Sequence, residues 1–339
     1  MDDAKLNEIV ESVVRQLIAA GAVSAPAAPA AVSPFPQQNV GQANQPALSP
    51  ASVPAASIPP TSELQPLTSI SLPPASTSSL TIDLPDPATP DQRYKARVKN
   101  PKDADALKEL IASTTARIGV GRAGPRYNTA SLLLFQGDHA ITQDALYRDI
   151  DQRLLDEFGL FTVQTNVTDG KEQFLLRPDL GRQLSGDAKR ALNEKCAKNV
   201  NIQLVVGDGL SAAAIEANLR QIFPVIKQGI QSAGLTFGTP FSVKYCRVGV
   251  MNDIGEALQP DVVILLIGER PGLGRAESMS AYLGYKPKYG DTDADRDVVC
   301  NIFENGGTNP LEAGAFVVQI AQKMRQHQAS GVKLKLATK

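Results

Sequence analysis

One stretch of the chain decides the fold: Val262-Val263-Ile264-Leu265-Leu266-Ile267-Gly268-Glu269-Arg270-Pro271-Gly272-Leu273-Gly274. Its first six residues are large aliphatics, four of them β-branched, which is typical of a parallel strand buried on both faces. The run is too short to cross a membrane. Because open α/β sheets bind ligands beyond the carboxyl ends of their strands, the turn from Gly268 to Gly274 is the first candidate binding loop. A plain tight turn between a strand and a helix is the alternative interpretation.

Strands and helices alternate on both sides of this run. We expect strands at 202–206, 241–250 and 262–267, a helix that begins at Ser211, and a closing helix at 309–326. Arg247 is an odd residue for the interior of the second strand. The order predicts a Rossmann-like parallel sheet with helices on both faces over residues 201–339.

Residues 93–200 have a more helical pattern. Asn100 and Pro101 are typical of a helix start. Further helices are expected at 131–151 and 187–198, with short strands at 161–167 and 173–176. The sequence therefore predicts a mainly helical N-terminal part of the body ahead of the sheet.

The first 92 residues differ from this body in composition. Fifteen of the 24 prolines lie between Pro26 and Pro90, a stretch without Lys or Arg, so residues 22–92 are predicted to form a disordered linker. Ahead of it, apolar residues at helical spacing predict an amphipathic helix over residues 1–21: Leu6, Ile9, Val10, Val13, Val14, Leu17 and Ile18. A lone helix of this length is marginal in water. We expect a docking peptide, with folding back on its own body as the alternative.

Charge and cysteine content exclude several classes of partner. The net charge is −1 and the pI is about 6.2, so we expect neither nucleic acid nor a membrane as a partner. The three cysteines are odd in number and widely separated, which favours the reducing cytoplasm. His139 and His327 are the only histidines, so Cys/His ligand spacing is absent and no metal site is expected.

A literal dinucleotide fingerprint occurs from Gly119 to Gly124. Such a fingerprint binds a dinucleotide only when a buried strand leads into it and a helix begins inside it. Here a helix is expected before the glycines, and Pro125 follows them directly. This context argues against a dinucleotide site. Because the glycine pattern itself is present, a self-contained NAD(P)-dependent enzyme remains the alternative function, and a non-enzymatic scaffold is a third interpretation.

No nucleophile with its base is recognisable, and the Walker phosphate loop is absent. Asp208 lies in a turn, Gly207-Asp208-Gly209-Leu210-Ser211, between an expected strand and helix. Its backbone N–H groups would favour a polar or anionic ligand, although a helix-entry role for Asp208 is equally expected. Asp208, Glu256 and Glu269 could act as acids or bases, but unsupported carboxylates are usually structural.

Five blocks of the body follow one another in order: Gly121-Arg122-Ala123-Gly124-Pro125-Arg126, Arg177-Pro178-Asp179-Leu180-Gly181-Arg182, Gly207-Asp208-Gly209-Leu210-Ser211, Gly268-Glu269-Arg270-Pro271-Gly272-Leu273-Gly274 and Asn305-Gly306-Gly307-Thr308. Together, over about residues 98–331, they closely resemble one family, the small (light) subunit of ethanolamine ammonia-lyase. The resemblance implies an adenosylcobalamin-dependent lyase that converts ethanolamine to acetaldehyde and ammonia. It also implies a separate large subunit, a TIM barrel that holds the substrate, while the small subunit closes over the cobalamin and supplies no catalytic acid or base.

Carried over by motif, the family's cobalamin contacts fall on Val248, which follows Arg247, and on Glu269. The third contact is a cysteine in an Ala-Asp-Arg-x-Cys pattern. This chain reads Ala294-Asp295-Arg296-Asp297-Val298-Val299-Cys300, so Val298 stands at the cysteine position and Cys300 lies two residues later. A backbone or packing contact could persist at Val298, whereas a specific thiol role could not.

The N-terminal helix resembles the peptides that direct enzymes into bacterial microcompartments. This resemblance implies shell proteins as partners of residues 1–21 and a cytoplasmic location inside such a compartment. The location suits an enzyme whose product is a volatile aldehyde.

Overall fold

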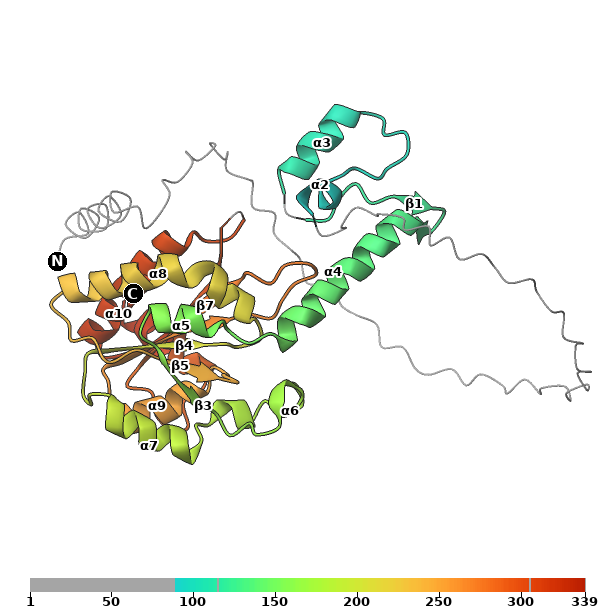
Figure 1. Cartoon of the computed structure of the whole chain (residues 1–339). Helices are drawn as coiled ribbons and strands as arrows, with labels where there is room; N and C mark the ends of the chain where they lie inside the picture. Colours follow the sequence, from blue (N-terminus) through green and yellow to red (C-terminus); the bar gives the residue numbers. More distant parts are fainter. Residues whose placement is uncertain (1–88, 115, 305, 339) are drawn as a thin grey trace, which may run out of the picture. The chain divides into compact units, whose positions relative to one another are not determined.

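The computed structural model describes residues 89–338 apart from 115 and 305 (Figure 1). The expected helix over 1–21 and residues 22–88 of the expected linker lie outside the described residues. A six-stranded sheet lies at the centre of the described part, in the order β3-β5-β4-β6-β7-β8. Its strands are β3 (Phe161–Gln164), β4 (Ile202–Gly207), β5 (Phe241–Lys244), β6 (Val262–Gly268), β7 (Met279–Tyr285) and β8 (Arg296–Ile302).

The sheet is mixed, which corrects the expectation of a parallel one. β3, β5, β4 and β6 are parallel, but β7 is antiparallel to β6 and β8 is antiparallel to β7. The segment between β6 and β7 returns without a crossover helix, and only an antiparallel partner can be reached in that way. β3 joins the sheet from the part of the chain that precedes residue 201.

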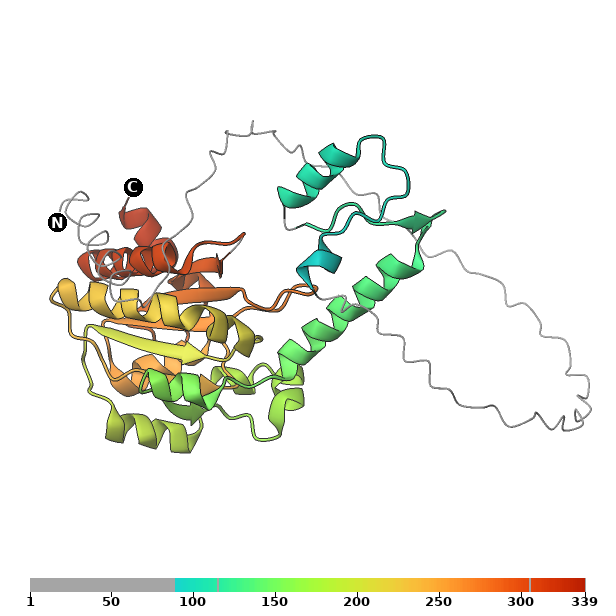
Figure 2. The same ribbon diagram turned by 45° about the horizontal axis from the view of Figure 1, so that its top comes forward.

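Helices cover both faces of the sheet (Figures 1 and 2). α8 (Ala212–Ser232) and α10 (Pro310–His327) lie on one face, and α7 (Gly186–Lys195) and α9 (Val250–Leu258) lie on the other. β6 contributes alternate residues to the two cores: Val262, Ile264 and Leu266 to the first, and Val263, Leu265 and Ile267 to the second. Since burying each such side chain contributes roughly 1.5–3 kcal/mol, this strand holds the two layers together.

Side-chain caps explain where several helices begin. Ser211 caps α8 as expected, because its Oγ accepts a hydrogen bond from the N–H of Ala214. The helix expected from Asn100 begins later, at α3 (Ala104–Ala112), where the Asp103 carboxylate accepts from two backbone N–H groups. Asn100 has a positive φ of 55°, which is not the extended conformation of a capping residue.

Three expected strands were wrong in type or extent, among them the strand expected at 161–167, which ends at Gln164. Residues 173–176 belong to the helix α6 (Gly170–Leu176), and the strand expected at 241–250 ends at Lys244, after which the chain turns into α9. The expected helices at 131–151 and 187–198 correspond to α4 (Thr129–Tyr147) and α7.

The remaining short elements complete the described chain: α2 (Pro90–Arg93), β1 (Arg122–Ala123), β2 (Arg126–Tyr127), α5 (Gln152–Glu157), η1 (Leu180–Arg182), η2 (Asp293–Asp295) and α11 (Gly331–Ala337). Among the helices from residue 89 onward, none is both long and apolar enough to span a bilayer.

Candidate functional site

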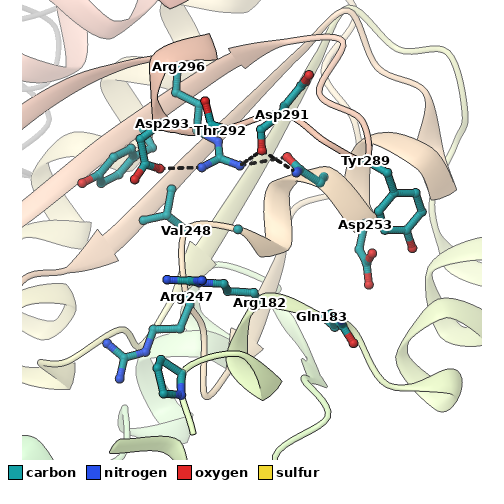
Figure 3. Close-up of a pocket in the computed structure, with 14 residues that line it drawn as sticks. Arg182, Gln183, Arg247, Val248, Asp253, Tyr289, Asp291, Thr292, Asp293 and Arg296 are labelled. Carbon is teal, nitrogen blue, oxygen red and sulfur yellow. Dashed lines mark hydrogen bonds and ion pairs between the residues drawn. The ribbon is translucent and has the colours of Figure 1, made fainter.

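A cavity of about 520 Å³ begins beyond the carboxyl end of β5 and runs along α9 towards β7 and β8 (Figure 3). Its walls come from η1, from the start of α9, from Tyr282 of β7 and from the segment that leads into β8. The volume lies within the range of small-molecule binding sites. Arg247 and Val248, two of the residues predicted from the sequence, both line this cavity.

The turn that carries Arg247 and Val248 is held by Asp208, which is buried at the end of β4. The Asp208 carboxylate accepts hydrogen bonds from the N–H of Tyr245 at 2.9 Å and of Cys246 at 2.8 Å. Its charge is balanced by Lys171 of α6, whose Nζ lies 2.9 Å from Oδ2. These bonds hold the chain in a turn where it leaves β5, so Asp208 positions the turn that lines the cavity.

Arg247 is half-buried at the rim of the cavity. Its Nη2 donates to the carbonyl of Phe174 at 3.1 Å, and its guanidinium lies 4.3 Å from the centre of the Phe174 ring. Its Nε is buried without a partner among the described residues. Burial lowers the pKa of Arg247, and the nearby guanidinium groups of Arg182 and Arg270 lower it further.

Glu269 follows β6 directly, and its carboxylate lies at a β-bulge between β7 and β8. Met279 pairs with Ile302 and Ala281 with Val299, so Cys300 and Asn301 together oppose the single residue Ser280. The N–H of Asn301 at this bulge donates to Glu269 Oε1 at 2.9 Å.

Two hydroxyls complete the surroundings of the Glu269 carboxylate. Ser280 Oγ donates to Oε1 at 2.5 Å and Ser278 Oγ donates to Oε2 at 2.6 Å. Burial raises the pKa of Glu269, but the three hydrogen bonds lower it by more and keep it below the ordinary value of 4.5. Glu269 is therefore ionised at neutral pH and can accept one further hydrogen bond at Oε2.

Val298 lies opposite Tyr282 across the β7–β8 ladder. Its side chain is 47% exposed, although it stands in a strand, and it lies on the same face of the sheet as Tyr282. Cys300 is exposed, has no disulfide partner and sits at the bulge. The structure thus brings Val298, Arg247 and Val248 around Tyr282, with Glu269 and Cys300 at the neighbouring end of β7.

Helix α4 fixes the second half of the candidate loop that follows Glu269. Thr142 Oγ1 donates to the carbonyl of Gly272 at 2.9 Å and accepts from the N–H of Gly274 at 3.3 Å. Arg93 Nη1 donates to the carbonyl of Gly274 at 2.7 Å, and Arg117 Nη2 reaches the carbonyl of Leu273 at 3.3 Å. Side chains of Thr142, Arg93 and Arg117 therefore hold the backbone of this loop, which is more than a plain tight turn between two elements.

Both of these arginines are held by one buried carboxylate on α4. Asp138 is 1% exposed, and its two oxygens contact Arg93 Nη2 at 2.8 Å and Arg117 Nη2 at 2.5 Å. Because each arginine also contacts the loop backbone, Asp138 indirectly positions the loop that carries Glu269.

The glycines from Gly119 to Gly124 do not have the geometry of a dinucleotide site. They lead into the short antiparallel pair β1–β2, whose paired residues are all exposed. In the described chain no buried strand leads into them, and the next helix, α4, begins only at Thr129. The geometry that a pyrophosphate requires, with a helix beginning inside the glycine motif, is not formed here.

Sequence reasoning missed several residues of the site. Arg182, Tyr282 and Asn252 line the cavity, and Asp138 and Lys171 fix its surroundings. Arg182 falls within the block 177–182, which could have indicated it, but the partnership of Asp138 with residues far away in sequence has no local signal. Among the residues that the structure describes, no cluster of three or more His, Cys, Asp or Glu side chains could hold a metal ion.

Residues 104–335 match the family model described as ethanolamine ammonia-lyase light chain. The chain is 46% identical over 252 residues to the "Ethanolamine ammonia-lyase small subunit" of Clostridium perfringens, a match that covers 74% of this chain and 85% of that one. It is 46% identical over 245 residues to the protein of that name from Clostridioides difficile, covering 72% and 83% of the two chains. It is 44% identical over 252 residues to the one from Listeria monocytogenes, covering 74% and 85%.

Proposed function

Because the chain belongs to the family of ethanolamine ammonia-lyase light chains, we propose that its cavity forms one side of an adenosylcobalamin site that the large subunit completes. The chain is thus part of a lyase. Its relatives are named small subunits, which implies a large subunit as partner. The observation that carries the proposal is the position of Arg247 and Val248 in the cavity, with Val298 and Glu269 on the same side of the sheet.

The residues present fit such a group. A corrin has apolar ring faces and a rim of amide side chains, and Val248, Tyr282 and Val298 offer apolar surface to the former. Four buried side-chain atoms among the described residues have no hydrogen-bond partner, and two of them, Arg247 Nε and Arg296 Nε, belong to residues that line the cavity. Glu269 Oε2 can accept from an amide N–H. The cavity is far smaller than the whole cofactor, so a second wall from the large subunit is needed.

When bound, adenosylcobalamin supplies the radical that starts the conversion of ethanolamine to acetaldehyde and ammonia. The work of this chain is to bind and orient the group and to exclude water from one side of it. Val248 and Val298 provide packing, Glu269 accepts a hydrogen bond from the corrin rim, and Arg247 offers hydrogen-bond donors to the cofactor. No residue of this chain is assigned a proton transfer. Cys300 at the bulge is assigned a position beside the cofactor but no thiol chemistry.

The organisation of the chain follows the same proposal. Residues 201–339 supply most of a Rossmann-like cobalamin-binding part, to which η1 of the more helical part, 93–200, adds one wall. The proposed linker runs over 22–88, because α2 already begins at Pro90. Residues 1–21 dock onto microcompartment shell proteins and place the enzyme inside that compartment. Support for the docking role comes from the apolar stripe of the sequence and from the proline-rich segment behind it.

An absorption titration tests the central proposal. The chain is titrated with cobalamin and with NADH, each in the presence and absence of the large subunit. We expect saturable cobalamin binding by the two-subunit complex and no binding of NADH. Binding of NADH by this chain alone would instead favour the NAD(P)-dependent enzyme, and binding of neither ligand would favour a scaffold.

A further inference from the structure

Two arginine side chains at the rim of the cavity lie close together without an acidic partner (Figure 3). Arg182 ends η1, and its side chain makes no hydrogen bond or ion pair with any of the residues described here. Its aliphatic stem packs against Gly249, since a Cβ on that glycine would lie 2.9 Å from Arg182 Cγ. Arg247 donates only to a backbone carbonyl, and its Nε is buried and unpartnered. The two positively charged side chains thus lie beside the cavity, and neither forms an ion pair with a described carboxylate.

None of the three acidic residues that line the same cavity forms an ion pair with Arg182 or Arg247. Asp253 accepts from Lys189 Nζ at 3.0 Å and from the N–H of Leu184 at 2.7 Å. Asp293 pairs with Arg296 Nη1 at 2.7 Å, on the other side of the cavity in Figure 3.

Asp291, the third of these acids, accepts from the N–H of Lys288 at 3.0 Å. Within the described part of the chain, the only carboxylate that offsets the charge of Arg247 is Asp208, and that group is bound to Lys171 and to two backbone N–H groups. The positive charge of Arg182 and Arg247 is therefore left for a ligand to balance.

The N-terminus of α9 adds a third favourable group. This nine-residue helix begins after Gly249, and both Val248 and Gly249 line the cavity. The N–H groups of its first three residues donate to the backbone carbonyls of Arg247, Val248 and Gly249, so the helix start acts on the cavity through its dipole. The start of a helix carries partial positive charge and stabilises an anion placed near it. Arg182, Arg247 and the start of α9 thus line the same cavity.

We propose that Arg182, Arg247 and the start of α9 form a subsite for a phosphodiester group. This inference rests on the proposed function, because the phosphodiester is the one in the nucleotide loop of the cobalamin. A guanidinium group donates two parallel hydrogen bonds to phosphate oxygens, and Arg182 has all of its donors available. Val248 next to the subsite accommodates the apolar corrin edge. Inorganic phosphate is the other source of the same chemistry.

The test compares cobalamin with cobinamide, which keeps the corrin ring but lacks the nucleotide loop and its phosphate. Affinities are measured by corrin absorbance on the complex of both subunits, for the wild type and for Arg182→Gln. We expect Arg182→Gln to weaken cobalamin binding about tenfold, the scale of a hydrogen bond to a charged group, and to change cobinamide binding by less than about twofold. Arg182→Lys should recover part of the loss.

Two further measurements make the comparison decisive. Arg190→Gln on α7 is the matched control, because Arg190 is 71% exposed, pairs with Asp187 and lies outside the cavity. It should leave both affinities unchanged. Millimolar inorganic phosphate should weaken cobalamin binding by the wild type and leave binding by Arg182→Gln unaffected.

Each other result overturns the inference in its own way. Equal cobalamin affinity for the wild type and Arg182→Gln removes the subsite and leaves the proposed function standing. Equal losses for cobalamin and cobinamide, or weaker subunit assembly without any corrin, would assign Arg182 to a carboxylate of the large subunit. Competition by phosphate without discrimination between the two corrins would make free phosphate the ligand. Absence of cobalamin binding by the wild-type complex would refute both the function and the subsite.

Discussion

Gly274 approaches Asp138 so closely that a Cβ on this glycine would lie 2.4 Å from Asp138 Oδ1. Gly274 also has a φ of +69°, a conformation that side chains disfavour. The loop that begins at Glu269 therefore reaches the Asp138 carboxylate only because residue 274 is a glycine. Helix α4, which precedes the sheet in the sequence, is in this way part of the site.

Asp138→Asn should loosen this loop. The substitution removes the charge that balances Arg93 and Arg117, both of which also bind the loop backbone. We expect a loss of about 2 kcal/mol in the free energy of unfolding, because two partly buried arginines lose a buried counter-charge. Cobalamin affinity of the two-subunit complex should fall several-fold with unchanged turnover at saturation. Asp105→Asn, which breaks only an exposed ion pair on α3, is the control for chemical denaturation and titration. A loss of stability without any loss of affinity would make Asp138 purely structural.

Glu269→Gln should weaken cobalamin binding by about 1 kcal/mol, the scale of one hydrogen bond. The substitution keeps the shape of the side chain but leaves one acceptor oxygen where the carboxylate has two. Turnover at saturating cofactor should change little, since Glu269 is assigned a binding role. The measurement is the pair of cofactor affinity and saturated rate. A lower saturated rate with unchanged affinity would contradict the assignment.

The same carboxylate should give a pH signature. The pKa of Glu269 lies below 4.5 in the folded protein, so its stabilising hydrogen bonds are fully present above the unfolded pKa. They are lost as the pH falls through the lowered pKa. Thermal unfolding should therefore show a gap between the wild type and Glu269→Gln at pH 7 that narrows below about pH 4.5. A gap that widens on acidification would mean that the carboxyl group is stabilising in its protonated form.

The purified chain alone should show no ammonia-lyase activity and should bind cobalamin weakly. It offers one wall of a cavity of about 520 Å³, while the cofactor is far larger. Activity should return when the large subunit is added, as measured by acetaldehyde formation with ethanolamine and adenosylcobalamin. Robust turnover without the large subunit would refute the assignment.

Residues 1–21 should direct packaging without contributing to catalysis. Deletion of residues 1–88, which leaves α2 and Arg93 in place, should leave the activity of the reconstituted enzyme intact. Val13→Asp combined with Leu17→Asp should abolish co-localisation with compartment shells, because both charges fall on the apolar stripe. Ser12→Asp combined with Gln16→Asp is the matched control at the same spacing. Equal shell association of the wild type and the apolar-face double variant would show that the helix has another task.

The parts of the fold that the sequence predicts well are those with a strong local signal. The aliphatic run of β6 and the Ser211 cap of α8 were confirmed, because hydrophobic burial and capping act within a few residues. β7 was missed: Ser280 and Gly284 interrupt its apolar residues, and it owes its place to pairing with β6 and β8. The strand expected at 241–250 was predicted too long. After Lys244 the chain forms a turn, and the buried Asp208 fixes it by accepting hydrogen bonds from two backbone N–H groups.

The residues of the site also fall into those with a local sequence signal and those without one. Family motifs led to Val248 and Glu269, and the structure places Val248 in the cavity and Glu269 on the same side of the sheet. They could not lead to Asp138 or Lys171, because each contacts a loop that lies far away in the sequence. Arg247 was a candidate cofactor contact from its place beside Val248, although it was also an odd residue for a strand interior; the physical reason is that the strand has already ended there.

The edge position of β3 has a consequence for synthesis of the chain on the ribosome. β3 pairs only with β5, and Thr162 and Ser242, which face each other across that pair, are 80 residues apart in the sequence. Since translation proceeds from the amino terminus, β3 emerges well before the strand it needs. Until then its ladder groups are open to pairing with another nascent chain. The arrival of β5 therefore closes one side of β3, while its other side remains an edge of the described sheet.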